Sequence, residues 1–224
     1  MPNPKLLLML LLCVAAPVGA ATGRDEQAAA SPDEVLRQLT EGNARFVAGH
    51  PADKDWRRQV AATAMAQYPK AIVLSCVDSR VPVEAVFDQG VGDIFVARVA
   101  GNVVGEQTLG SLEFATKLAG AKLVMVLGHG GCGAVKGAIA KAELGHMGAV
   151  LTEIAPAVAE ARTHLPAGAG EGELLDASVR ANVLRSVTEL RRRSPVLAGL
   201  ERTGAIRIVG AYYDLHDGKV TVLP

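Results

Sequence analysis

The sequence of 224 residues has no net charge and few cysteines. Lys and Arg together number 23, as do Asp and Glu. A chain without excess positive charge has no electrostatic attraction to nucleic acid or to an anionic membrane surface, so neither partner is expected. Only three cysteines occur, Cys13, Cys76 and Cys132, and the first falls within an N-terminal apolar segment.

That apolar segment has the pattern of a secretory signal peptide. Lys5 precedes the run Leu6 to Ala16, which is too short to span a membrane, and Val18-Gly19-Ala20 supplies small residues for cleavage. We expect residues 1–20 to be removed, leaving a periplasmic or secreted protein without a membrane span. Residues 21–31 are predicted to form a flexible leader, and residues 32–224 a single catalytic domain.

Two apolar runs beyond the leader break off into residue types that bind metals. Ala71 to Leu74 leads into Cys76-Val77-Asp78-Ser79-Arg80, and Leu123 to Leu127 leads into His129-Gly130-Gly131-Cys132. Short apolar runs bounded by turn residues are typical of buried strands in a parallel sheet. Because ligands in such sheets lie beyond the carboxyl ends of the strands, both sets of side chains are predicted to face one crevice.

Cys76, His129 and Cys132 form a donor set that suits Zn²⁺, which binds thiolates and imidazole well. Asp78 is the candidate for a fourth ligand in a closed state of the site. Arg80 lies two residues further on, so an extended chain places it on the same side, where its guanidinium can hold the Asp78 carboxylate off the metal. A disulfide between Cys76 and Cys132 is the alternative in an oxidising compartment, although it leaves His129 without a role.

Glycines in the second motif raise a nucleotide-binding alternative. Gly128, Gly130 and Gly133 match the pattern G-x-G-x-x-G between a strand and a helix. That pattern calls for an acidic residue at the end of the next strand, whereas Glu153 falls in a segment of helical pattern. We favour the interpretation in which these glycines let the backbone turn tightly beside a metal.

The remaining pattern predicts an α/β fold with a mainly parallel central sheet flanked by helices. Ser31 and Pro32 begin an N-terminal helical arm that extends to about Ala48. An Asp-Gly turn between two strands predicts a C-terminal hairpin. Further helices are expected at 55–66, 110–119, 133–144, 150–164 and 174–193, and further strands at 93–99, 205–211 and 220–223.

Five segments match a known family. They are CVDSRVP at Cys76–Pro82, FDQGVGDIFVARVAGNVV at Phe87–Val104, SLEFA at Ser111–Ala115, GHGGCGAVKGA at Gly128–Ala138 and VGAYYDLHDGKV at Val209–Val220. Through them the chain resembles a bacterial β-class carbonic anhydrase with a plant-type-like active site, over about residues 32–223.

The resemblance implies reversible, zinc-dependent hydration of CO2 to bicarbonate and a proton by a zinc-bound hydroxide that Asp78 and Arg80 orient. It also implies substrate-pocket residues, namely Gln67, Phe95, Val99, Ala100 and Gly133. Members of the family associate as homodimers or larger assemblies, in which the N-terminal arm packs on a partner subunit. Packing of the arm on its own core is an equal alternative.

Two other functions share these sequence features. Relatives with the same zinc motif and fold hydrolyse CS2 or COS, and nothing in the motifs excludes that reaction. A periplasmic protein that binds zinc without catalysis is the alternative from a different functional class.

Overall fold

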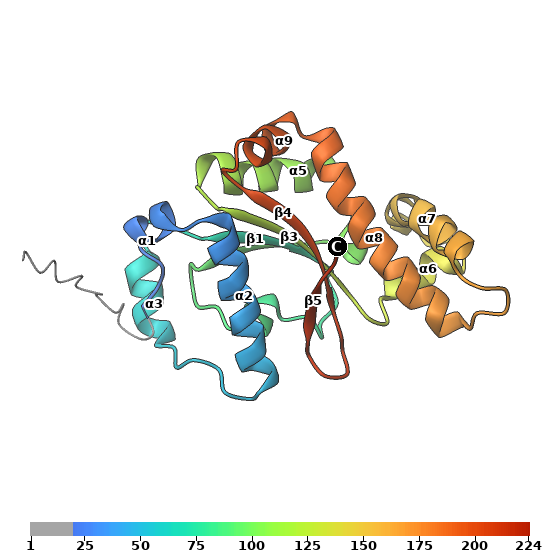
Figure 1. Ribbon diagram of the computed structural model, residues 1–224, viewed down its shortest axis with the longest axis horizontal. Coiled ribbons are helices and arrows are strands. Elements are labelled where there is room, and N and C mark those ends of the chain that lie inside the picture. Colours follow the sequence, from blue (N-terminus) through green and yellow to red (C-terminus); the bar gives the residue numbers. More distant parts are fainter. Residues whose placement is uncertain (1–19) are drawn as a thin grey trace, which may run out of the picture.

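The computed structural model describes residues 20–224 and shows a central five-stranded sheet (Figure 1). In spatial order the strands are β2 (Ile94–Arg98), β1 (Ala71–Ser75), β3 (Leu123–His129), β4 (Arg207–Tyr213) and β5 (Val220–Val222). Neighbouring strands are parallel except β5, which runs antiparallel to β4. The predicted α/β fold with a mainly parallel sheet and a C-terminal hairpin is confirmed.

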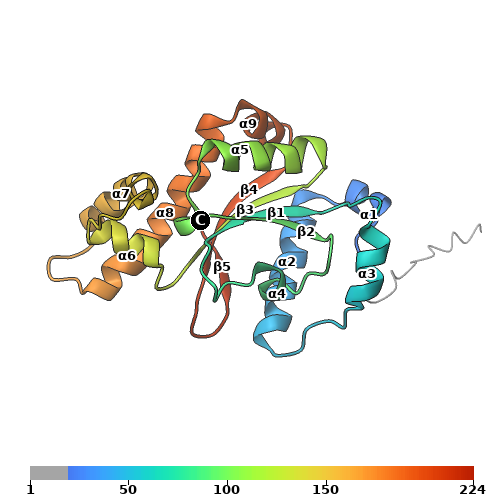
Figure 2. The ribbon, with the colours of Figure 1, turned by 180° about the vertical axis from the view of Figure 1, so that it is seen from behind.

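Alternating strand residues bury both faces of the sheet against helices. On one face, Val73 and Met125 pack with α2 (Pro32–Val47) and α4 (Val83–Val86). On the other face, Leu74 and Val126 pack with residues of three further helices, α5 (Glu106–Glu113), α8 (Glu171–Arg193) and α9 (Pro195–Arg202). Figure 2 shows these layers from behind. Burial on both faces explains why the strands are continuous apolar runs rather than alternating ones.

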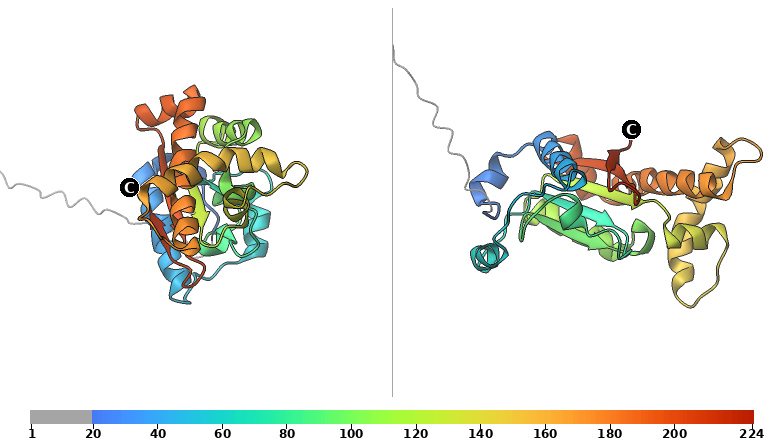
Figure 3. Two further views of the ribbon diagram at one scale, coloured as in Figure 1. Left: turned by 90° about the vertical axis from the view of Figure 1, so that its right-hand side faces the viewer. Right: turned by 90° about the horizontal axis from the view of Figure 1, so that it is seen from below.

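A third apolar cluster lies beyond the carboxyl ends of the parallel strands. It joins Cys76 and Cys132 to residues of α6 (Gly133–Ile139) and α7 (Met147–His164). These two helices project past the end of the sheet together with the first turns of α8 (Figure 3). The helices bury Cys76 and Cys132, whereas Val77 and Arg80, which follow β1, remain exposed.

The N-terminal arm packs on its own chain. Ser31 accepts a hydrogen bond from the Glu34 N–H, as predicted for an N-cap, and α2 buries Val35 and Leu39 in the core. An N-cap of this kind stabilises a helix by about 1 kcal/mol. Within one chain, the structure supports the alternative in which the arm covers its own sheet.

The predicted leader, residues 21–31, makes contacts with distant parts of the chain. It contains α1 (Arg24–Ala29), and the backbone and hydroxyl of Thr22 both donate to Asp93 Oδ1, at 2.9 and 2.6 Å. Gln27 is buried and donates to the carbonyls of Pro69 and Ala119. These partners are distant in sequence. The composition of a polar, alanine-rich segment therefore does not predict the contacts.

Most other helices begin or end within a few residues of their predicted limits. The remaining elements are α3 (Trp56–Thr63), the short helix η1 (Ala100–Asn102) and one turn of π-helix, η2 (Phe114–Leu118). Helix α9 was not predicted, although Ser194 caps it and Pro195 opens it. None of the helices within residues 20–224 is long and apolar enough to cross a membrane. The predicted signal peptide, apart from Ala20, lies outside the described residues.

Candidate metal centre

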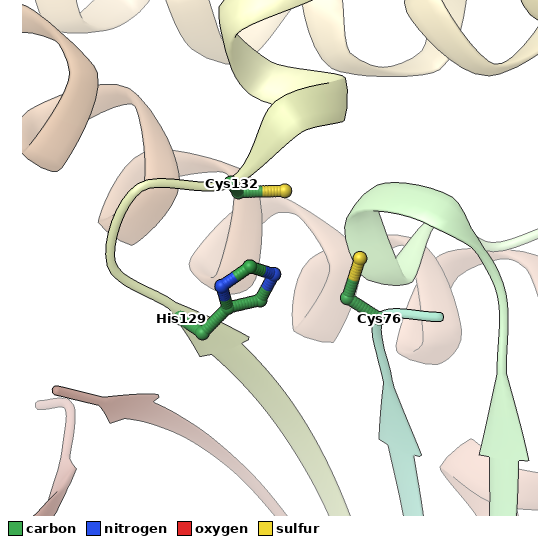
Figure 4. Close-up of side chains that lie close together, drawn as sticks. All are labelled: Cys76, His129 and Cys132. Atoms are coloured by element: carbon green, nitrogen blue, oxygen red, sulfur yellow. The ribbon is translucent and has the colours of Figure 1, made fainter. Parts of the chain in front are cut away.

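Three metal-binding side chains converge from two neighbouring strand ends. Cys76 directly follows β1, His129 closes β3, and Cys132 is the N-cap of α6. Because β1 and β3 are parallel neighbours, with Ser75 opposite Leu127, their carboxyl ends meet. One ligand atom from each of the three side chains lies within 4.8 Å of the others, and Figure 4 shows the side chains pointing toward a common centre.

The chemistry of this cluster fits a bound cation. All three residues are buried, and His129 is fully so. The Nδ1 of His129 lies 2.9 Å from the carbonyl oxygen of Gly130, to which it donates as the N–H tautomer. The Nε2 is then an unprotonated acceptor, and it has no hydrogen-bond partner. A buried polar atom without a partner is costly, so Nε2 is a free ligand position.

The two cysteines are free thiols that interact with each other. A hydrogen bond with Cys132 lowers the pKa of Cys76, and the backbone N–H of Gly101, which donates to the Cys76 sulfur, lowers it further. The same pairing, together with burial, raises the pKa of Cys132. The Cys76 thiol is therefore the more easily ionised of the two, and a thiolate is the form in which cysteine binds a metal.

Asp78 and Arg80 form an ion pair beside the cluster. Arg80 Nε and one terminal nitrogen donate to the two Asp78 oxygens at 2.9 and 2.8 Å, and the Arg80 backbone N–H adds a third bond at 3.0 Å. The Arg80 guanidinium holds the pKa of the Asp78 carboxyl well below its usual range. Asp78 Oδ2 is 3.8 Å from His129 Nε2. An ionised carboxylate thus stands next to the metal position and is held there by Arg80.

Comparisons with known proteins identify the family of the chain. The family model described as carbonic anhydrase matches residues 71–220, which include both strand ends and the hairpin. The chain belongs to the carbonic anhydrase family. It is 37% identical over 198 residues to a carbonic anhydrase of Mycolicibacterium smegmatis, covering 85% of this chain and 92% of that protein. It is 35% identical over 201 residues to one of Pseudomonas aeruginosa, covering 84% and 87%.

Solved structures identify the fold as that of β-carbonic anhydrases. A tetrameric β-carbonic anhydrase from Sordaria macrospora superposes with a TM-score of 0.67 at 21% identity, covering 85% of this chain and 97% of that one. The Coccomyxa β-carbonic anhydrase, solved in complex with acetazolamide, gives a TM-score of 0.67 at 22% identity and covers 85% and 82%.

Three of the predicted pocket residues lie around the ligands of this carbonic anhydrase-family protein. Val99 packs against the apolar cluster that contains Cys76 and Cys132. Ala100 begins η1, the short helix that contacts Cys76 through its second residue. Gly133 begins α6 directly after Cys132, and the space beside its Cα is open.

The structure does not bring the other two predicted pocket residues, Gln67 and Phe95, to the ligands of the same chain. Gln67 precedes the amino end of β1, whereas Cys76 follows its carboxyl end, so about 15 Å of strand separates them. Phe95 pairs with Ile72, four residues before Cys76 and about 13 Å along the strand. Gln67 and Phe95 were assigned to the pocket from their positions in the sequence motifs. Such positions do not give the distance between a residue and the metal ligands in the folded chain.

Sequence reasoning did not identify Arg98, which holds the turn that carries Asp78. Arg98 Nε donates to the Cys76 carbonyl at 2.9 Å, and a terminal nitrogen donates to the Asp78 carbonyl. The sequence signal for Arg98 was a charged residue near the end of the otherwise apolar strand predicted at 93–99. The structure pairs Arg98 with Ser75, the residue before Cys76.

Three glycines of the second motif, Gly128, Gly130 and Gly131, are explained by packing and backbone conformation. A Cβ at Gly128 would lie 2.4 Å from a Val183 methyl group, and one at Gly130 would lie 2.8 Å from the Tyr212 hydroxyl. Gly131 has a φ of +64°, the left-handed region that favours glycine. These three glycines therefore need no nucleotide to explain them, whereas a Cβ at Gly133 would meet nothing within 4 Å.

Proposed function

We propose that the protein catalyses the reversible hydration of CO2 to bicarbonate and a proton, with one Zn²⁺ held by Cys76, His129 and Cys132. The observation that carries the proposal is the convergence of these three ligand atoms beside an ionised Asp78 that Arg80 holds on both oxygens. The named relatives support the same reaction, since those at 35–37% identity are carbonic anhydrases.

In this proposal the chain's own residues position the reactants. Cys76, His129 and Cys132 would hold the zinc, which would supply a water of lowered pKa as the nucleophile at neutral pH. Asp78 would accept a hydrogen bond from that water and orient it toward the carbon of CO2. Arg80 keeps Asp78 ionised and away from the ligand position beside His129. Val99 contributes to the apolar wall that uncharged CO2 requires.

The proposal is tested by metal analysis together with stopped-flow CO2 hydration on the purified mature protein. We expect about one zinc per chain, loss of hydration after removal of the metal by a chelator, and recovery when zinc is restored. Faster turnover of CS2 or COS than of CO2 would favour the hydrolase alternative. Stoichiometric zinc without CO2 hydration above buffer would favour the non-catalytic zinc-binding protein.

We further propose that the protein forms a homodimer or larger assembly through the free edge of β2. Along this edge strand lies a groove of about 470 Å³ that Phe95 and Phe114 line, and the two rings are in edge-to-face contact at 6.1 Å. Phe114 is 50% exposed and Leu118 is 77% exposed. Large exposed apolar side chains beside an unpaired edge favour association. Phe95 and Gln67, which do not reach the ligands of their own chain, would then be available to a partner's pocket.

Association is tested by replacing Leu118 with lysine. The charge in the apolar patch should shift the protein toward smaller species in sedimentation velocity at micromolar concentration. Leu144→Lys is the matched control, because Leu144 is 72% exposed in the segment between α6 and α7. An unchanged sedimentation profile for Leu118→Lys, or an equal effect of both substitutions, would place the interface elsewhere.

We also propose that residues 1–20 are a cleaved signal peptide and that the mature protein is periplasmic or secreted. A chain that begins at Ala21 or Thr22 would keep the bond of 2.6 Å from the Thr22 hydroxyl to Asp93 Oδ1, so cleavage at this point is compatible with the fold. N-terminal sequencing of protein from the periplasmic fraction should begin at Ala21 or Thr22. Intact Met1 in the cytosolic fraction would contradict the proposal.

A further inference from the structure

The short helix η1 places a backbone donor on one of the metal-binding sulfurs. The Gly101 N–H donates to Cys76 Sγ at 3.3 Å inside the buried core. Gly101 has a φ of +66°, and a Cβ there would lie 2.6 Å from Ile154 Cδ1. The loop therefore depends on glycine both for its backbone conformation and for its close approach to α7.

Helix α8 holds this loop from the side away from the sulfur. Asn182 Nδ2 donates to the Gly101 carbonyl at 2.8 Å, and Ser186 Oγ donates to the Asn102 carbonyl at 3.2 Å. The two side chains are one helical turn apart on the same face of α8, and each is at most 4% exposed. The two successive loop carbonyls are thus anchored to a rigid helix.

We propose that Asn182 is a positioning residue of the metal centre. By fixing the Gly101 carbonyl, it keeps the N–H of the same residue directed at the Cys76 sulfur. A hydrogen bond to a thiolate spreads its negative charge and orients its lone pairs, and a neutral amide achieves this without adding a charge to the site. The inference deepens the proposed function and rests on it, since it requires a metal at Cys76, His129 and Cys132.

The test compares Asn182→Leu with the control Ser178→Ala. Leucine has a similar volume and no donor. Ser178 lies one turn earlier on α8, is fully buried, and its hydroxyl has no hydrogen-bond partner, so removing it leaves the loop untouched. Two readouts are independent of catalysis: zinc affinity by competition with a chromophoric chelator, and the thiolate-to-metal charge-transfer band of the cobalt-substituted protein.

For Asn182→Leu we expect zinc to bind about 10- to 100-fold more weakly, the usual effect of losing a partner of a metal ligand. The cobalt charge-transfer band should move to longer wavelength, because a sulfur without its hydrogen bond is more easily oxidised. Ser178→Ala should match the wild type in both measurements. A folded Asn182→Leu variant with wild-type affinity and spectrum would overturn the inference.

If the Asn182→Leu variant does not fold, two further measurements test the inference. Asn182→Ala removes the amide donor without adding a charge and is judged by the same two readouts. In the wild-type protein substituted with cadmium-113, the Gly101 amide proton should show scalar coupling to the metal through the N–H···S bond, and absence of that coupling would overturn the inference. A wild-type protein that binds no metal would instead overturn the proposed function.

Discussion

Replacing Arg80 with alanine should lower CO2 hydration by at least about 10²- to 10³-fold while zinc stays bound, the scale expected when an organised polar partner is lost from an active site. Arg80 makes two side-chain bonds to Asp78, whose Oδ2 lies 3.8 Å from the Nε2 of His129. Without Arg80, the carboxylate is free to move the short distance to the metal and take the position that water needs. Stopped-flow hydration measures the loss of activity, and metal analysis on the same sample shows whether zinc stays bound.

A double variant separates blockage from loss of orientation. Asp78→Asn removes the competing carboxylate and should itself cost about 10²- to 10³-fold, because an amide is a poorer acceptor for the nucleophile. If the freed carboxylate is the inhibitor, then Arg80→Ala combined with Asp78→Asn should be no slower than Asp78→Asn alone. Fully additive losses would contradict this mechanism.

The control for Arg80 is Arg207→Ala. Arg207 forms a surface ion pair with Asp33, and its side chain is 48% exposed against 57% for Arg80. Exposed pairs contribute little to stability, so this variant should keep both its zinc and its activity.

Replacing His129 with alanine should remove zinc and reduce hydration to the uncatalysed background. His129 supplies the only nitrogen of the three-ligand cluster found among residues 20–224, and two thiolates alone do not complete a catalytic zinc site. Metal content after dialysis, and hydration with and without added zinc, measure the effect.

His146→Ala is the matched control for this variant, because His146 is an exposed residue just before α7. It should keep its zinc and its activity. Stoichiometric zinc in the His129→Ala variant would mean that the metal is held by a different set of ligands.

Patterns within short segments predicted much of the fold and the centre of the site. The apolar runs at β1 and β3 are buried on both faces of the sheet, so their burial is visible in local sequence. The Ser-Pro pair that opens α2 was recognised, whereas the same pair at Ser194 and Pro195 was not, although it caps α9 in the same way. Pro195 lies two residues after the helix predicted at 174–193, where a proline is typical of a helix end, so the same residue hid the start of α9.

Features that depend on contacts between distant segments were not predicted. The leader is fixed by Asp93 and by the carbonyls of Pro69 and Ala119, which lie 42 to 92 residues from their partners. Helix α8 reaches the metal centre through Asn182, which is 81 residues from Gly101. Neither contact leaves a pattern in a short stretch of sequence.

The side chains able to bind a metal can be recognised from residue types and their positions, because two thiols, an imidazole and a carboxylate–guanidinium pair each close or follow a strand of recognisable composition. How these groups interact depends on the folded chain. The pairing of β1 with β3 brings the two motifs to one edge of the sheet, and Arg80 donates to both oxygens of Asp78. Helix α8 donates to the loop whose backbone N–H binds the Cys76 sulfur. The reason is physical: residue type sets the chemistry of a ligand, whereas distances between ligands are set by the packing of segments far apart in the chain.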